Sequence, residues 1–318
     1  EFQQDLVVLP GASLVVQNMT LRFGPDARIV VRPGGYARFT NCTLTSANCE
    51  GARWKGIRVE GTTSQDQLPV VHGDQGYLLL VNTAVVNAEL GVVAAREIVG
   101  GFDVGGYGGI VQCTGAHFRN CLRGARITDY HANVENGVEN NRSRFTNTRF
   151  TIDGGWPGGT PRWQLILRNT NGVDVTNCGF ANDAPQLFTE GAQGNGLLMA
   201  NAQTNVVGDD NPANSFVRGW NLGALSVLNF LTPVTVKKMH FSGNATALAD
   251  YGGLFGQYTF NTFTVPDQGT GATPRVGMLL WQTQLMTVER NLFQGQDAAP
   301  GLDENSVGIF HLGLNASL

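Results

Sequence analysis

Ala37-Arg-Phe-Thr-Asn-Cys-Thr-Leu44 sets the pattern of this chain: a strand-like run leads to a turn at Asn, and an apolar residue follows three positions later. The phrase returns as Ser143-Arg-Phe-Thr-Asn-Thr-Arg-Phe150 and as Val173-Asp-Val-Thr-Asn-Cys-Gly-Phe180. With looser copies included, the closing apolar residues are Leu44, Val85, Phe118, Phe150, Phe180, Phe216, Phe241, Phe263 and Phe293. They lie 22 to 41 residues apart, and this drifting period predicts a solenoid in which each copy forms one coil.

The composition favours stacked strands and argues against two kinds of partner. Only 14% of the residues are charged, and 42 of the 318 are glycine. An average soluble domain has roughly 25% charged residues, so this chain suits tightly stacked strands joined by frequent turns. The net charge of −4 and the lack of a basic run argue against nucleic-acid binding. The sequence contains no run of 18 apolar residues, so we expect no membrane insertion.

The repeat is compatible with two architectures, a parallel β-helix and a set of antiparallel blades. Blades predict a hairpin dipeptide such as Asn-Gly at each tight turn. Asn-Gly occurs only at 136–137, 171–172 and 195–196. We therefore predict an all-β fold, a right-handed parallel β-helix solenoid of about ten coils. Because the composition does not change along the repeat, we expect a single β-helix domain over residues 1–318, and the abrupt strand-like ends indicate a fragment of a larger multidomain protein.

Four asparagines occupy the same place in four copies of the repeat: Asn41, Asn82, Asn147 and Asn177. Equivalent amides in a stack can hydrogen-bond along it as a ladder. We expect these residues at equivalent turns, with buried amides bonded to backbone. Replacing Asn147 by Ala should then cost on the order of 1–3 kcal/mol.

The five cysteines show no spacing typical of a zinc site. Cys42 and Cys49 flank a turn, and Cys113 and Cys121 are eight residues apart. Either pair is compatible with a loop disulfide in an oxidising compartment, and the first pair is the better candidate. Buried thiols that act as small apolar groups are the alternative for both pairs.

Three segments carry a family resemblance: Leu14–Val31, Arg53-Trp-Lys-Gly-Ile-Arg-Val-Glu-Gly61 and Gly108–Cys121. Together they resemble the pectate-lyase-like, right-handed β-helix regions of large secreted proteins of Bacteroidota, most clearly over residues 6–180. The resemblance implies a multidomain parent exported by the type IX route and an extracellular or cell-surface location. Its Trp-x-Gly-Ile phrase, here Trp54-Lys-Gly-Ile57, identifies no chemistry.

Polysaccharide lyases share this fold, so a lyase site has to be considered. Such a site needs a basic residue beside a uronate carboxylate, which Ca²⁺ or further cationic side chains neutralise. The most suggestive group is Arg123 and Arg126 with Asp129 and His131, followed about one coil later by Arg142 and Arg144. Arginines that merely solvate the outside of the rod are the simpler interpretation.

A hydrolase site and a sugar-stacking loop are the other candidates. A β-helix hydrolase needs paired carboxylates about 5–10 Å apart. Asp209-Asp210 is the only acidic pair of that type, and the Asn-Pro that follows favours a solvated turn or a weak Ca²⁺ loop. The insertion Gly154–Trp163 is the one candidate for a loop that presents aromatic side chains to a sugar, with packing on the rod surface as the alternative.

These observations favour a non-catalytic extracellular β-helix module that acts as a rigid structural, adhesive or assembly unit of a surface or secreted protein. No catalytic, cofactor-binding or metal-binding residue is assigned, and Ca²⁺ is the one ion considered. The alternative is a polysaccharide lyase or glycoside hydrolase that acts on an extracellular polysaccharide. Expected partners are other domains of the parent protein or a second copy that covers the coil ends, and carbohydrate.

Overall fold

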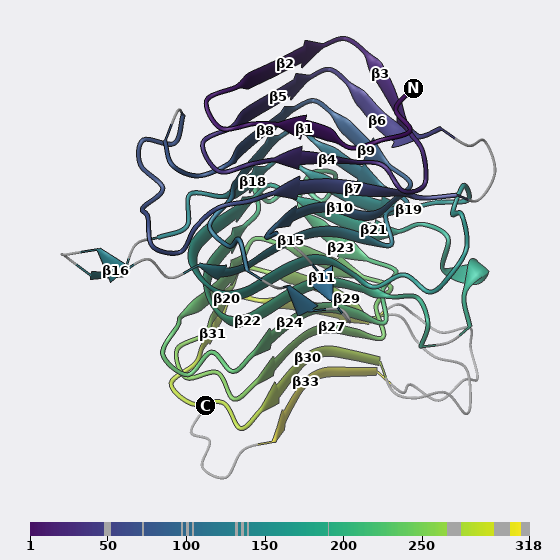
Figure 1. Cartoon of the computed structure of the whole chain (residues 1–318). Coiled ribbons are helices and arrows are strands. Elements are labelled where there is room, and N and C mark those ends of the chain that lie inside the picture. Colours follow the sequence, from purple (N-terminus) through teal and green to yellow (C-terminus); the bar gives the residue numbers. More distant parts are fainter. Residues whose placement is uncertain are drawn as a thin grey trace.

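The computed structural model describes the chain except for residues 48–51, 72, 97, 100–101, 104, 131–132, 135–136, 139, 190, 266–274, 296–305 and 313–318. Strands of successive coils pair in parallel, and the chain passes through three strands in each coil (Figure 1). Ten such coils run from β1 (Leu6–Val8) to β32 (Leu292–Gly295), and β33 (Ser306–Leu312) stacks on the tenth. The predicted all-β fold, a right-handed parallel β-helix of about ten coils, is confirmed.

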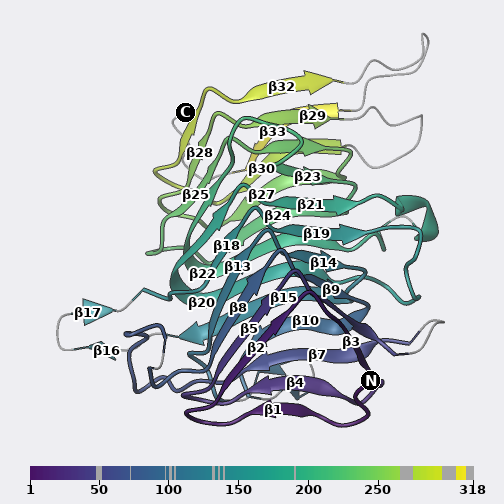
Figure 2. The same cartoon turned by 90° about the horizontal axis from the view of Figure 1, so that it is seen from above.

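The three strands of each coil build three faces, which we call the first, second and third sheets (Figure 2). The first sheet contains β1, β4 (Arg28–Val31), β7 (Trp54–Val59), β10 (Ala88–Ala94), β15 (Arg123–Tyr130), the beginnings of β20 (Trp163–Thr176) and β22 (Asn195–Val207), β24 (Leu222–Val227), β27 (Thr246–Tyr251), β30 (Arg275–Trp281) and β33. The second contains β2 (Ser13–Gln17), β5 (Tyr36–Thr40), β8 (Tyr77–Val81), β13 (Ile110–Thr114), β18 (Arg144–Thr146), the ends of β20 and β22, β25 (Val234–Lys237), β28 (Gln257–Thr259) and β31 (Thr287–Glu289).

The third sheet contains β3 (Thr20–Phe23), β6 (Thr43–Ser46), β9 (Ala84–Val86), β14 (His117–Arg119), β19 (Arg149–Ile152), β21 (Gly179–Asn182), β23 (Phe216–Arg218), β26 (His240–Ser242), β29 (Thr262–Val265) and β32. Two short antiparallel pairs lie outside the coils, β11 (Ile98–Val99) with β12 (Phe102–Asp103) and β16 (Asn133–Val134) with β17 (Gly137–Val138). One 3-10 helix, Pro185–Leu187, follows β21.

The closing apolar residues of the repeat form an inward column on the third sheet. The rings of Phe118, Phe150 and Phe180 stack with centroids 4.9 Å apart. Later in the column, Phe263 stacks on Phe241 at 4.9 Å and on Phe293 at 4.7 Å. This spacing is that of paired strands, so aromatic stacking follows directly from parallel, in-register coils.

Phe216 is the exception in this column. Its neighbour Val217 pairs with Phe180 and takes the inward place. Phe216 packs on Gly179, where an added Cβ would lie 2.4 Å from its ring. The guanidinium groups of Arg149 and Arg218 lie over the Phe216 ring, at 5.3 and 4.6 Å from its centroid. Including Phe216 in the repeat was therefore wrong by one residue.

The four predicted asparagines lie at one corner of the coil, between the second and third sheets. Asn41, Asn82, Asn147 and Asn177 all have left-handed backbone, with φ between 46 and 53°. Each backbone N–H donates to a carbonyl of the next coil. Asparagine suits this place because, after glycine, it adopts left-handed backbone at the lowest cost. The expected equivalence is confirmed, but the expected burial is wrong, since Asn41, Asn82 and Asn147 are exposed.

At most corners the residue after the left-handed residue is buried, and several of these residues contact the coil before it. Thr83 shows the contact in full: its Oγ1 donates to the carbonyl of Phe39 at 3.0 Å and accepts the N–H of Cys42 at 3.3 Å. These two backbone groups lie on either side of Asn41, the left-handed residue of that coil. We call this contact, from an inward corner residue to the backbone around the preceding corner, the corner clasp.

Three cysteines occupy clasp positions. The Sγ atoms of Cys42, Cys121 and Cys178 lie 3.4 to 3.5 Å from carbonyl oxygens of the preceding coil. Burial raises the pKa of the Cys121 and Cys178 thiols to about 12, so both remain protonated donors. Cys113 and Cys121 are buried free thiols, so of the two interpretations open for this pair the structure shows the buried thiols. Cys42 is also a free thiol, and its expected partner Cys49 lies outside the described residues.

From β24 onward several corners have asparagine in the clasp position, although at one corner buried Met239 follows the left-handed Lys238. The amide nitrogens of Asn229, Asn244 and Asn261 each donate to a carbonyl of the preceding coil at 2.9 Å. Their Oδ1 atoms accept a backbone N–H from the same coil at 2.7 to 3.0 Å. All three side chains are buried. Buried amides bonded to backbone therefore exist in this protein, but at other asparagines than the four predicted.

Candidate functional site

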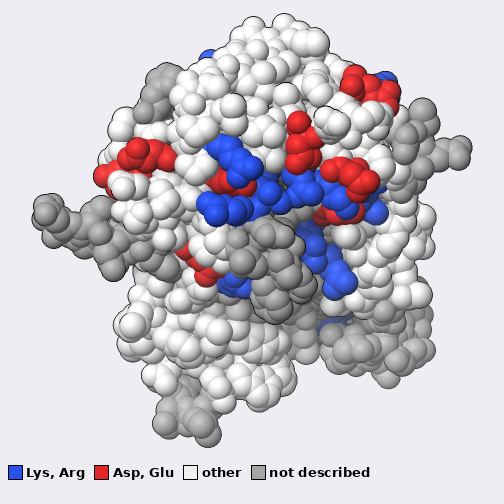
Figure 3. All heavy atoms as spheres, viewed as in Figure 1, with Lys and Arg blue, Asp and Glu red and all other residues white. Residues whose placement is uncertain are grey.

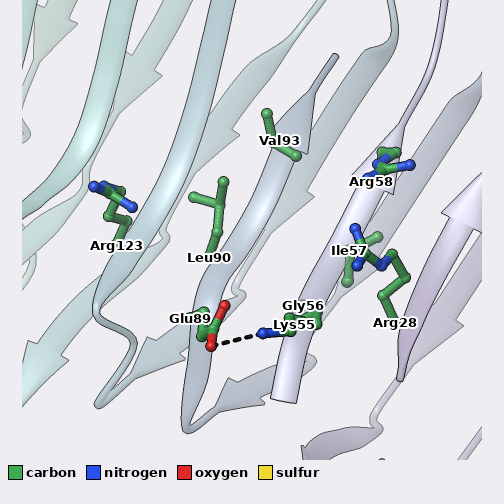
Figure 4. Close-up of a pocket in the computed structure, with 9 residues that line it drawn as sticks. All are labelled: Arg28, Lys55, Gly56, Ile57, Arg58, Glu89, Leu90, Val93 and Arg123. Atoms are coloured by element: carbon green, nitrogen blue, oxygen red, sulfur yellow. Dashed lines mark hydrogen bonds and ion pairs between the residues drawn. The ribbon is translucent and has the colours of Figure 1, made fainter. Parts of the chain in front are cut away.

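Lys and Arg side chains gather on the outward face of the first sheet, over β4, β7, β10 and β15 (Figure 3). A cavity of about 350 Å³ opens among them. Its lining residues are Arg28, Lys55, Gly56, Ile57, Arg58, Glu89, Leu90, Val93 and Arg123 (Figure 4). We call this cavity the basic groove.

Strand register places the charged residues of the basic groove. Arg28 pairs with Gly56, Gly56 with Leu90, and Leu90 with Arg123, so these four residues form one outward column across four coils. Parallel strands are about 4.8 Å apart, which separates the backbones of Arg28 and Arg123 by about 14 Å. Lys55 stands next to Gly56 on β7 and completes the row of cations.

Gly56 gives the groove its floor. It has φ of 92° at a register shift between β7 and β10, and a Cβ added to it would lie 1.7 Å from the carbonyl oxygen of Leu90. No other residue fits here, because the two backbones touch where a side chain would stand. The Trp54-Lys-Gly-Ile57 phrase thus has a structural explanation: Trp54 and Ile57 are buried in the core, Gly56 forms the floor, and Lys55 faces the groove.

The electrostatics of the groove differ from those of the chain. Arg28, Lys55, Arg58 and Arg123 against the single carboxylate of Glu89 give the lining a net charge of +3, whereas the whole chain carries −4. Lys55 Nζ lies 2.9 Å from Glu89 Oε1. The side chains of Arg28 and Lys55 are 29% and 30% exposed, and Arg28 Nε lies 3.6 Å from Asp5 Oδ2.

A buried carboxylate fixes the arginines beside the groove. Glu60 is fully buried, and its oxygens lie 2.8 Å from Arg32 Nη1, 3.6 Å from Arg58 Nη1 and 3.9 Å from Arg96 Nε. A buried charge must be paired, so these guanidinium groups are held near Glu60. Because three cations surround one anion and Arg58 also lines the groove, positive charge extends beyond the groove itself.

The predicted lyase cluster does not come together. Arg123 lines the basic groove, but Arg126 is buried at 5% exposure. Asp129 accepts hydrogen bonds from Arg168 at 2.7 Å and from Asn169 at 2.6 Å, which engages both carboxylate oxygens. His131 lies outside the described residues. Arg142 and Arg144 lie at the second sheet, on another face from Arg123.

The Asp209-Asp210 pair forms a turn. The oxygens of Asp209 accept hydrogen bonds from Asn214 at 2.8 Å, from the Ser215 hydroxyl at 2.9 Å and from the Asn211 N–H at 3.1 Å. Hydrogen bonds, that from Asn214 foremost, lower the pKa of Asp209. Asp210 forms an ion pair with Lys238 at 2.5 Å. Both carboxylates are thus engaged locally, as the simpler interpretation of this segment expects.

The tryptophan insertion packs on the rod. The Trp156 ring lies between the Arg53 guanidinium, 4.4 Å from its centroid, and the Phe188 ring at 5.9 Å. Its Nε1 donates to the carbonyl of Gly159 at 2.8 Å. Trp156 is thus half-buried by contacts within the chain, as the alternative of packing on the rod surface expects.

Sequence reasoning missed most of the basic groove. Arg28, Lys55, Arg58 and Glu89 were not singled out, because each is an isolated charge in its own segment. One signal was present: the charges at 28, 55–58, 89 and 123 recur at about the spacing of the coil repeat. Residues one repeat apart in a solenoid lie on neighbouring rungs, so charges at that period predict a cluster.

Among the residues that the structure describes, no group of three or more His, Cys, Asp or Glu side chains could hold a metal ion. In the same part of the chain, no helix has the length and apolar character needed to cross a membrane. Comparisons with protein-family models, with curated proteins and with solved structures found no match.

Proposed function

We propose that this β-helix is a non-catalytic extracellular module that binds an acidic polysaccharide in the basic groove. The observation that carries the proposal is the net charge of +3 on the groove lining in a chain of net charge −4. A local excess of positive charge attracts a polyanion to the groove, while the negative net charge of the chain repels it.

The arrangement of the cations suits a linear polymer. Arg28, Lys55 and Arg123 follow one another across the coils along about 14 Å of the first sheet. A chain of acidic sugars laid across these strands would meet a cation at several successive units. Arginine forks pair with carboxylate or sulfate in two-pronged fashion, which favours defined binding over loose attraction.

The groove favours binding over cleavage. Hydrolysis needs two carboxylates that face the scissile bond. Glu89 is the only carboxylate among the described residues that line the groove, and Lys55 is paired with it. The lyase alternative relies on the same cations as the binding proposal, and only an assay for cleavage separates the two.

The coil ends support the assembly part of the proposal. At the first coil, Leu9, Val15 and Met19 are 60%, 53% and 53% exposed. At the last described strands, Leu292 and Phe310 are 51% and 43% exposed. We propose that other domains of the parent protein or a second copy of the chain cover such apolar surface. Light scattering across a concentration series tests the second copy, and a monodisperse monomer at every concentration would count against it.

The groove is tested by calorimetric titration with polygalacturonate, with uncharged dextran as the reference polymer. A triple variant, Arg28→Gln, Lys55→Gln and Arg123→Gln, removes three groove cations. The control variant, Arg22→Gln, Lys237→Gln and Arg290→Gln, removes the same charge elsewhere. We expect the groove variant to bind ~10-fold more weakly or worse, at about 0.5 kcal/mol per cation, and the control to bind as the wild type does.

Three outcomes would overturn the proposal. Equal loss of affinity in both variants would show that the polymer responds only to the overall charge of the chain. If polygalacturonate did not bind at all, acidic polysaccharides would be excluded as the ligand. Appearance of unsaturated uronate absorbance, with or without Ca²⁺, would replace the binding module by the lyase alternative. Binding through the groove should also weaken with salt, because the Debye length falls from about 10 Å at 0.1 M to about 3 Å at 1 M.

A further inference from the structure

A second cavity, of about 560 Å³, lies on the outward face of the second sheet. Its floor is formed by Gln112, Arg144 and Asp174, which pair with one another on successive rungs of β13, β18 and β20. One wall is formed by Leu68 and Val71 from the segment between β7 and β8. We call this cavity the polar cleft. It lies on another sheet than the basic groove and shares no lining residue with it.

The apolar wall of the polar cleft is held by two buried glutamines. Gln67 Nε2 donates to the carbonyl of Gly108 at 2.8 Å, and its Oε1 accepts the N–H of Arg142 at 2.5 Å. Gln75 Nε2 donates to the carbonyls of Thr62 and Gln65 at 2.8 and 2.9 Å. These bonds fix the segment at both sides of Leu68 and Val71, which remain 52% and 43% exposed. The wall therefore has a fixed position and an accessible apolar face.

The floor offers a donor group and an acceptor group side by side. Arg144 Nη2 donates to Gln112 Oε1 at 3.0 Å, and Asp174 accepts from Asn205 Nδ2 at 3.3 Å. Arg144 and Asp174 stand on neighbouring rungs and are both exposed, and each bonds to a neutral amide. The guanidinium thus keeps donors, and the carboxylate keeps acceptor sites, for a ligand.

A third polar group is placed by a glycine. Asn140 is exposed and lines the cleft together with Gly172. A Cβ added to Gly172 would lie 2.4 Å from the Asn140 Cβ, so the missing side chain makes the space that Asn140 occupies. The amide of Asn140 supplies both donors and an acceptor.

We propose that the polar cleft binds an uncharged sugar unit of a glycan. A sugar ring has hydroxyl groups that both donate and accept, and a face of C–H groups that packs on apolar side chains. The planar groups of Arg144, Asp174 and Asn140 match the hydroxyls, while Leu68 and Val71 match the C–H face. The lining holds two guanidinium groups, Arg142 and Arg144, and one carboxylate, Asp174, which an anion on the floor would meet. A wholly apolar ligand would exclude water from Arg144 and Asp174 without replacing its hydrogen bonds. The volume lies in the usual range of small-molecule sites, about 300–1,000 Å³.

The experiment is saturation-transfer NMR and calorimetric titration of the full chain with four uncharged hexaoses: cellohexaose, mannohexaose, xylohexaose and laminarihexaose. We expect at least one to bind. Asp174→Ala and Asn140→Ala should each weaken that binding ~10-fold, the loss of one hydrogen bond of about 1–1.5 kcal/mol. Gln257→Ala is the matched control, because Gln257 is exposed on the same face of the second sheet, and it should bind as the wild type does.

Binding of none of the four hexaoses would overturn the proposal, as would equal binding by the wild type and both cleft variants. Stronger binding of an acidic hexaose in the cleft would overturn it as well. The triple groove variant Arg28→Gln, Lys55→Gln and Arg123→Gln should bind the uncharged hexaose as the wild type does. The polyanion site in the basic groove and the sugar site in the polar cleft can therefore fail independently of each other. Circular dichroism of each variant checks that the fold is intact.

Discussion

The corners of the β-helix come in two versions, one in the coils up to β23 and one in the coils from β24 onward. In the early coils the left-handed residue is mostly Asn, Asp or Gly, and the clasp behind it is a hydroxyl or thiol, as at Thr83 and Cys178. In the late coils the asparagine has moved one position along the chain. It now makes the clasp, as at Asn229 and Asn261, and the left-handed place goes to residues such as Leu228.

The two versions differ in the cost of the left-handed backbone and in the strength of the clasp hydrogen bonds. In the early coils the backbone is relaxed, because asparagine tolerates left-handed φ, and the thiol clasps are weak, since S–H is a poor donor. In the late coils Leu228, Phe260 and Arg290 have φ of 59, 58 and 54°, which costs about 1–2 kcal/mol for such residues. The amide clasps offset this strain with two full-length hydrogen bonds each. At these three corners a strong clasp accompanies a strained left-handed residue, whereas at Lys238, with φ of 59°, buried Met239 takes the clasp position.

The strongest test of this comparison removes an amide clasp. Asn261→Ala leaves the carbonyl of Val236 and the N–H of Met239 without their side-chain partner in the core. We expect a loss of about 2–5 kcal/mol in the free energy of unfolding, because each buried unsatisfied group costs about 1–3 kcal/mol. Chemical denaturation measures it. A loss smaller than about 1 kcal/mol would show that the clasp adds little.

The late coils also bury a carboxylate, which gives them a pH dependence. Asp250 is fully buried, accepts the Tyr258 hydroxyl at 2.5 Å and the Gly253 N–H at 3.1 Å, and burial raises its pKa. Because the folded pKa exceeds that of the unfolded chain, its stabilising contribution is full below the ordinary pKa and is lost as pH rises through the raised value. Wild type should therefore gain stability relative to Asp250→Asn on acidification from about pH 7 to about pH 4. Asp26→Asn, at an exposed position, is the control, and a difference that is constant with pH would contradict the argument.

Exchanging Asn and Leu between two left-handed positions tests whether the backbone conformation sets the cost. Asn147→Leu places a branched side chain at φ of 49° and should cost about 1–2 kcal/mol. Leu228→Asn relieves φ of 59° at a side chain that is 55% exposed, and should stabilise by up to about 1 kcal/mol. Thermal unfolding of both variants measures the pair. Changes of the same sign would show that φ does not decide the effect.

The smallest effect is expected from an exchange within the early version of the corner. Cys178 and Thr148 are equivalent corner residues of consecutive coils, and each donates to the carbonyl two residues before it, at 3.4 and 3.1 Å. Cys178→Thr should change the free energy of unfolding by less than about 1 kcal/mol, because one buried donor replaces another of similar size. Cys178→Asp serves as the disruptive reference, since it places a charge in the core. A Cys178→Thr loss as large as that of the reference would mean that the thiol has a role which a hydroxyl cannot fill.

The sequence alone determined the architecture of this protein. The repeat of strand, Asn turn and apolar residue predicts coils, and eight of the nine closing residues stand in one inward column. The repeat predicts the column because each coil of a solenoid stacks on its neighbour. Residues one repeat apart in the sequence therefore lie above one another in the structure. The left-handed turns at Asn41, Asn82, Asn147 and Asn177 were equally accessible, since the conformation belongs to the residue and its immediate neighbours.

Tertiary structure alone decided which asparagines are buried and which charges meet. Asn147 and Asn261 look alike in sequence, but one is the left-handed residue and the other follows it, and this shift by one position turns a side chain from solvent to core. The basic groove needs Arg28, Lys55 and Arg123 from three coils in register, and the register shifts at Gly56. The period of these charges points to a cluster, but loops of unequal length separate the residues along the chain. The exact register therefore depends on how many residues each loop takes out of the stack.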